Sequence, residues 1–125
     1  MTKLSNIITL LTDFGLSDPY VGVMKGVIAG LSPTSTILDL THQVLPQNIL
    51  EAAFLLSTSY RQFPVGTIFV CVIDPGVGTN RLPILVATSE YYFVGPDNGL
   101  FGFLNETKNK AIVHLQNHKY FRTPV

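Results

Sequence analysis

The sequence predicts an α/β protein, a mostly parallel sheet flanked by helices in a layered, Rossmann-like arrangement. Three short apolar runs, at residues 6–12, 37–40 and 67–73, are separated by two segments whose apolar side chains recur at helical spacing. Strands that alternate with helices form βαβ units, which build parallel sheets. With 125 residues and 46% hydrophobic content, the chain fits a single domain with a real core, which we expect to span residues 1–125.

The first part of the chain contributes a strand and a helix. Residues 6–12 form a continuous apolar run, as in a parallel strand covered on both faces, and an Asp-Phe-Gly turn at 13–15 ends it. Asp18 can cap the helix, with Pro19 in its first turn, and Pro33 marks its end. The apolar side of this helix is predicted from residues at helical spacing: Val21, Met24, Val27, Ile28 and Leu31.

The rest of the chain continues the alternation. Residues 37–40 form a second short strand, and residues 48–60 again show helical spacing. Residues 67–73 are apolar throughout and rich in β-branched side chains, as expected for a third strand. The later elements are predicted to be strands at 84–88, 91–95 and 111–115, and a turn at 96–99 that leads into a short helix.

Charge and composition exclude several classes of function. Eight Lys and Arg residues balance eight Asp and Glu residues, so no basic surplus is available for a nucleic-acid partner. No apolar run is long enough for a transmembrane helix, and no signal peptide frames the N-terminal run. We therefore expect a cytoplasmic protein without a membrane partner. The single cysteine, Cys71, lies in an apolar strand and is interpreted as core packing.

Aspartates stand at the exits of three predicted strands. Asp13, Asp74 and Asp97 occupy these positions although only 13% of the residues are charged. Ligands of open parallel sheets bind beyond the carboxyl ends of the strands, so these carboxylates are expected to face one crevice. Asp13 could accept two hydrogen bonds from a ribose diol. Each aspartate alone can also be an ordinary turn residue whose side chain bonds to its own backbone.

Other polar residues have a structural interpretation beside a functional one. Asp18 is favoured as a helix cap. His42 could be a metal ligand or a base, but it has no carboxylate or histidine partner at metal spacing, so a structural role is favoured and no metal site is predicted. His114 and His118 are expected at the surface. Without a dinucleotide fingerprint, a Walker loop or clustered cations, the strand exits suit an uncharged or cationic nucleoside better than a phosphate.

Four motifs, in the same order along the chain, resemble those of one enzyme family. They are TDFGLSDPYVGVMKG (12–26), ILDLTHQV (37–44), FPVGTIFVCVIDPGVGTNR (63–81) and YFVGPDNGLFG (92–102). Over residues 6–104 the chain is similar to the S-adenosylmethionine hydroxide adenosyltransferases, or SAM hydrolases, which are related to fluorinases and chlorinases. The resemblance implies attack of water or hydroxide at C5′ of S-adenosylmethionine, giving adenosine and methionine. It also implies no cofactor besides this substrate, and a homo-oligomer, which is a trimer in the family.

The resemblance further implies roles for five residues. Asp13 would hold the ribose hydroxyls, and Asp18 would lie near the amino-acid end of the substrate. Asp74 and Arg81 match two members of a catalytic Asp-Arg-His set that positions and activates the water, and Asn98 would line the same pocket. The Asp74 carboxylate also disfavours an anionic halide as nucleophile. Taken from the residues alone, Asp74 and Arg81 could instead form a salt bridge that braces their loop.

Two features of that family are missing from this sequence. Its His-Gly-Arg-Asp motif has no counterpart, since neither His114 nor His118 stands in such a context. Its smaller C-terminal β-rich domain, which holds the adenine, is also missing. We therefore expect a chain truncated at its C-terminal end and incomplete for catalysis by itself. The alternative is a non-catalytic remnant of the family that binds a nucleoside or serves as an oligomerisation unit.

Overall fold

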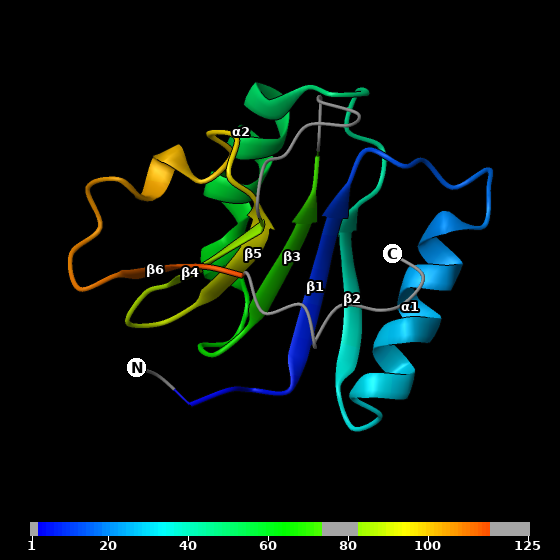
Figure 1. Ribbon diagram of the computed structural model, residues 1–125, viewed down its shortest axis with the longest axis horizontal. Helices are drawn as coiled ribbons and strands as arrows, with labels where there is room; N and C mark the ends of the chain where they lie inside the picture. The colour runs from blue at the N-terminus through cyan, green and yellow to red at the C-terminus, as the bar shows by residue number, and fades with distance from the viewer. Residues whose placement is uncertain (1–2, 74–82, 116–125) are drawn as a thin grey trace.

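The computed structural model describes residues 3–73 and 83–115 as one sheet with two α-helices (Figure 1). Every predicted element is present, and the predicted bounds of the strands and of the second helix lie within one residue of the observed ones. The strands and helices are β1 (Ile7–Thr12), α1 (Tyr20–Leu31), β2 (Thr36–Thr41), α2 (Ile49–Ser59), β3 (Ile68–Val72), β4 (Pro83–Ala87), β5 (Tyr92–Pro96) and β6 (Ala111–His114), with short 3-10 helices η1 (Tyr60–Gln62) and η2 (Gly102–Leu104).

The predicted fold class, a mostly parallel sheet flanked by helices, is confirmed. The six strands lie in the order β2-β1-β3-β5-β4-β6, and β2, β1, β3 and β5 are mutually parallel. β4 pairs antiparallel with both β5 and β6. Only a tight turn joins β4 to β5, and such a short connection can form an antiparallel hairpin but not a parallel crossover.

The two helices begin at sequence signals of different strength. α2 starts after Asn48, whose Oδ1 accepts the Glu51 N–H at 2.9 Å, while the Glu51 carboxylate reaches back to the Leu45 N–H. This arrangement satisfies backbone donors that a helix start leaves unpaired. α1 begins at Tyr20, so Pro19 precedes the helix instead of occupying its first turn, which corrects the prediction. Asp18 still supports this helix start, because its Oδ1 accepts the Tyr20 N–H.

The core lies on the face of the sheet that α2 covers. Figure 1 shows α2 behind the sheet and α1 beside β2. Buried side chains of α2, β3 and β5 form one cluster with η1 and η2, and Tyr60, Phe69, Tyr91 and Phe93 make ring contacts at its centre. Gly95 allows β5 to approach β3 here, because a Cβ would stand 2.7 Å from the Cys71 carbonyl oxygen. Cys71 is fully buried, as predicted, and burial raises the pKa of its thiol.

The opposite face is covered less evenly. Thr9 to Thr12 of β1 are buried, in keeping with the prediction of a strand covered on both faces. Along β3 and β5, by contrast, buried residues alternate with half-buried ones such as Val70 and Val94. Apolar residues line two hollows on these strands, of about 280 and 350 Å³. Neither helix in the described part of the chain is long and apolar enough to cross a membrane.

One buried hydroxyl of the sheet gives a stability prediction. Thr9 Oγ1 is buried and has no hydrogen-bond partner among the described residues. Removing an unsatisfied hydroxyl while keeping the shape relieves its desolvation penalty, so Thr9→Val is expected to raise the free energy of unfolding by about 1 kcal/mol. Urea denaturation measures this change.

Thr67→Val is the matched control for Thr9→Val. Thr67 is also fully buried, but its Oγ1–H donates to the Pro64 carbonyl oxygen at 2.7 Å. The same substitution should therefore lower the free energy of unfolding there by about 1 kcal/mol. Equal losses in both variants would show that the Thr9 hydroxyl is satisfied.

Candidate functional site

The parallel strands direct their carboxyl ends to one edge of the sheet. The chain passes from β1 to β2 on one side and then crosses to β3 on the other side of β1. Thr12 at the end of β1 lies opposite Val72 at the end of β3. The strand order therefore reverses between β1 and β3, and ligands of open α/β sheets bind in the crevice outside such a switch point.

Asp13 stands at this switch point, directly after β1. Its Oδ2 accepts the backbone N–H of Gln47 at 2.7 Å, which connects the loop after β1 to the loop after β2. Gln47 has a positive φ of 62°, an uncommon conformation for a residue other than glycine, and this backbone supplies the donor. A carboxylate has about four acceptor positions, so Asp13 keeps the capacity to accept two more hydrogen bonds.

Asn98 reaches the switch point from the other side. It lies in the turn after β5, where its Nδ2 donates to the Ile73 carbonyl oxygen at 2.6 Å and its Oδ1 accepts the Leu100 N–H. Because Ile73 is the residue that follows β3, Asn98 ties the exit of β5 to the exit of β3. The structure thus places Asp13 and Asn98 on either side of the β3 exit.

Asp18 belongs to a different local arrangement. It is exposed, and its recorded hydrogen bond is the one to the Tyr20 N–H at the start of α1. Nearby, Phe14 and Tyr20 are in edge-to-face contact, with ring centroids 6.0 Å apart. Asp18 therefore supports the start of α1 from the residue before the N-cap position, which Pro19 occupies, whereas the substrate role implied by the resemblance stays a prediction.

Asp74 and Arg81, the two predicted catalytic residues, lie outside the described residues. So does His118. Their expected roles remain predictions from the sequence. In the sequence they come between Ile73, whose carbonyl oxygen accepts the Asn98 Nδ2–H, and Pro83 at the start of β4.

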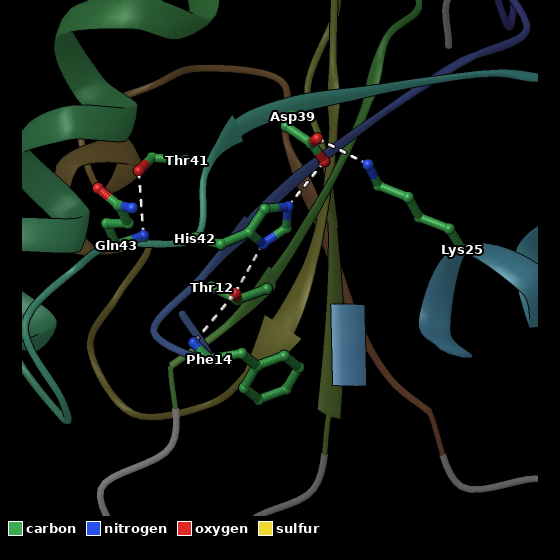
Figure 2. Close-up of polar contacts among 7 residues, drawn as sticks. All are labelled: Thr12, Phe14, Lys25, Asp39, Thr41, His42 and Gln43. Atoms are coloured by element: carbon green, nitrogen blue, oxygen red, sulfur yellow. Dashed lines mark hydrogen bonds and ion pairs between the residues drawn. The ribbon is translucent and has the colours of Figure 1, made fainter. Parts of the chain in front are cut away.

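A buried histidine links the exits of β1 and β2 (Figure 2). His42 is 3% exposed, its Nε2 lies 2.7 Å from Asp39 Oδ1, and its Nδ1 lies 2.8 Å from Thr12 Oγ1. Asp39 also accepts a hydrogen bond from Lys25 of α1 at 2.7 Å. His42 thus has a carboxylate partner, Asp39, that was not predicted from the sequence. The available signal was its position three residues before His42, near the end of a predicted strand. Both ring nitrogens are engaged, which supports the structural role favoured for this histidine.

The charge on Asp39 is stabilised by its neighbours. Partial burial opposes ionisation, but the hydrogen bonds from Lys25 and His42 outweigh it and hold the pKa of Asp39 below its ordinary value of 3.8. A carboxylate with a lowered pKa in the folded state stabilises the fold above the pKa of the unfolded chain. That stabilisation is lost as the pH falls through the folded-state pKa.

The lowered pKa predicts that the contribution of Asp39 to the stability of the fold is lost in acid. Asp39→Asn should lower the melting temperature at neutral pH. The difference in melting temperature between the variant and the wild type should become smaller as the pH falls below 3.8. Thermal unfolding followed by circular dichroism between neutral pH and pH 3 checks this. Glu106→Gln, which removes an exposed carboxylate in the loop after η2, serves as the control. A difference that stays constant with pH would contradict the prediction.

The remaining predicted groups lie outside this arrangement. His114 is about half exposed in β6, with its Nε2 3.4 Å from Asp97 Oδ2, in agreement with its predicted surface position. Among residues 3–73 and 83–115, no three His, Cys, Asp or Glu side chains are grouped as metal ligands would be. The 280 Å³ hollow borders the ends of β3 and β5 and is lined by Val72, Val94 and Pro96 among others.

Fold and site together define an α/β protein with a candidate nucleoside site at the carboxyl edge of its sheet. Residues 8–125 match the family described as the SAM hydroxide adenosyltransferase N-terminal domain. The chain belongs to this family, which confirms the resemblance seen in its motifs.

Individual relatives agree with this assignment. The chain is 42% identical to the (R)-S-adenosyl-L-methionine hydrolase of Methanocaldococcus jannaschii, over 92% of this chain and 46% of that protein. It is 34% identical to a fluorinase of Nocardia brasiliensis, over 75% of this chain and 39% of that protein. The crystal structure of an uncharacterized conserved protein from Thermotoga maritima superposes with a TM-score of 0.84 and 41% identity, covering 91% of this chain and 45% of the other. The chain thus spans less than half the length of these relatives.

Proposed function

We propose that this chain supplies the ribose-binding and water-binding part of a site that hydrolyses S-adenosylmethionine to adenosine and methionine. The observation that carries the proposal is the placement of Asp13 and Asn98 on either side of the β3 exit, from which the chain continues into Asp74. Asp13 would accept hydrogen bonds from the ribose hydroxyls, and Asn98 would line the pocket while it holds the β3 exit in place. The name of the M. jannaschii relative supports the choice of substrate.

The proposed reaction needs little more than a well-placed water molecule. The water oxygen attacks C5′, the C5′–S bond breaks, and the sulfur takes the electron pair and leaves as the neutral thioether of methionine. The water loses one proton, which the Asp74 carboxylate can accept or direct to solvent, while Arg81 favours the ionised form of that carboxylate. Because the sulfonium is a good leaving group, the rate acceleration comes mainly from holding the nucleophile in line behind C5′.

The nucleophile is proposed to be water or hydroxide and not a halide. A halide that approached Asp74 would meet a negative charge, whereas neutral water would donate a hydrogen bond to it. The degree of similarity points the same way, with 42% identity to a named SAM hydrolase and 34% to a named fluorinase.

The direct test is incubation of the purified chain with S-adenosylmethionine in isotopically labelled water. Turnover by this chain would give adenosine and methionine on chromatography, and mass spectrometry would find the label in the 5′ hydroxyl of adenosine. Asp74→Asn should abolish turnover, whereas Glu106→Gln should leave it unchanged. Label-free adenosine, or equal turnover in Asp74→Asn, would refute the proposed mechanism.

A second candidate function is binding without catalysis. It is favoured by the described residues themselves, in which Asp13 and Asn98 offer hydrogen-bonding groups to a nucleoside. Calorimetric titration with adenosine separates the two functions, because binding without product formation would identify a nucleoside-binding module.

We further propose that the chain forms homo-oligomers. Apolar side chains are exposed on α2, where Leu50 is 84% and Phe54 66% exposed, and surface of this kind supports self-association. Light scattering coupled to size-exclusion chromatography tests this, and a monomer at all concentrations would refute it.

A further inference from the structure

We propose that His42 is a positioning residue of the candidate site, which holds the loop after β1 so that Asp13 meets a ribose ligand in a fixed geometry. This inference rests on the proposed function, since it concerns the same ligand. It adds a role for a residue that does not itself touch the ligand.

The first observation is that His42 holds the loop on both sides of Asp13. Before Asp13, the imidazole Nδ1 bonds to Thr12 Oγ1 at 2.8 Å. After Asp13, the His42 carbonyl oxygen accepts the Gly15 N–H at 2.7 Å. Gly15 has a φ of 73°, a conformation that glycine adopts without strain and that lets the chain turn back toward His42. One residue of the loop after β2 therefore holds both ends of the four-residue segment from Thr12 to Gly15, which contains Asp13.

The second observation is that, for a neutral ring, the hydrogen bonds of His42 fit a single tautomer. Ionised Asp39 can only accept, so the Nε2 of the ring carries the proton that is directed to Asp39 Oδ1. Nδ1 is then an acceptor, and the Thr12 hydroxyl donates to it. The Thr12 oxygen in turn accepts the Phe14 N–H at 3.2 Å. The Thr12 hydroxyl therefore links the His42 ring to the backbone N–H of Phe14, directly after Asp13 (Figure 2).

The third observation is that the same loop also contacts the Asp13 side chain. The Gln47 N–H reaches Asp13 Oδ2 from five residues beyond His42. His42 sets the backbone around Asp13, and Gln47 sets the direction of its carboxylate. Because His42 is buried and bonded on both sides, it provides a rigid support, and ligand-binding groups depend on such support for their geometry.

The test compares two pairs of variants by calorimetric titration with adenosine and with 2′-deoxyadenosine. His42→Ala removes the imidazole and its bond to Thr12 but keeps the backbone carbonyl that accepts the Gly15 N–H, and His114→Ala is the matched control at an exposed histidine. Thr12→Val removes only the hydroxyl at constant shape, and Thr12→Ser restores it, so this pair remains informative if His42→Ala does not fold. His42→Ala and Thr12→Val should each weaken adenosine binding about tenfold or more and reduce the preference for adenosine over 2′-deoxyadenosine. His114→Ala and Thr12→Ser should behave like the wild type.

The outcomes separate this inference from the proposed function. If the wild type binds adenosine and the variants bind it equally well with the same preference, the positioning role is refuted while the proposed function stands. If the wild type binds no adenosine and turns over no S-adenosylmethionine, both fail. Hydrogen exchange at the Phe14 and Gly15 amides gives a ligand-independent readout. Exchange that stays as slow in His42→Ala and Thr12→Val as in the wild type would overturn the inference without any ligand.

Discussion

Phe93→Ala is expected to lower the free energy of unfolding by about 3–5 kcal/mol, a large share of the 5–15 kcal/mol typical of a domain. Phe93 is fully buried in β5, where its ring stacks on Phe69 with centroids 5.3 Å apart. It also makes edge contacts with Tyr60 and Phe103. Alanine would leave a cavity at the centre of this aromatic cluster. Urea denaturation followed by far-UV circular dichroism measures the loss.

The matched control is Leu31→Ala at the end of α1. Leu31 is 75% exposed, so its truncation removes little buried area, and alanine is the better helix former. Its effect should stay within about 0.5 kcal/mol of the wild type. Comparable losses at both positions would mean that the cluster around Phe93 is not the centre of the core.

The sequence predicts the elements of this fold well because local signals agree with the final structure. The apolar runs at 6–12 and 67–73 form β1 and β3, and the helical spacing over residues 48–60 predicted both ends of α2 within one residue. The weakest prediction was the start of α1, because Asp18 and Pro19 are both compatible with several positions in the first turn. There the structure places the helix one residue later than the sequence suggested.

The arrangement of these elements is less accessible from sequence. The spatial order of the strands and the position of the switch point depend on which helix covers which face, which no local motif states. The partners of His42 illustrate the difficulty. Thr12 lies 30 residues away, and it meets His42 only through the pairing of β1 with β2, which includes an irregularity between Leu10 and Leu11. A register shift of this kind has no signature in a single sequence.

The residues of the candidate site could be predicted more reliably than the contacts between them. Asp13 was singled out because it follows a strand, and Asn98 because of the family resemblance, and both lie at the expected edge. The contact from Asn98 to the Ile73 carbonyl, across 25 residues, depends on β3 and β5 being neighbours, and was not foreseen. The contact of Asp18 is local by contrast, because its carboxylate accepts the N–H of Tyr20 two residues further along the chain.

The largest expected effect on ligand binding is that of Asp13→Asn. The amide keeps one acceptor oxygen for the Gln47 N–H but loses the charge and the second acceptor oxygen that would receive a ribose hydroxyl. A hydrogen bond to a charged group contributes about 1.5–3 kcal/mol, so the affinity for adenosine should fall about 10- to 100-fold. Calorimetric titration measures it, with Glu106→Gln as the control for the loss of a carboxylate.

The choice of ligand makes this prediction specific to the ribose. If Asp13 accepts hydrogen bonds from the diol, the wild type should prefer adenosine to 2′-deoxyadenosine, and Asp13→Asn should lose most of that preference because the acceptor that reads the 2′ hydroxyl is gone. A variant that binds more weakly but keeps the full preference would show that Asp13 acts elsewhere, for example only by anchoring the loop after β2 through Gln47. Unchanged melting temperature in Asp13→Asn would confirm that the loss arises at the ligand and not from unfolding, since the Gln47 contact can persist.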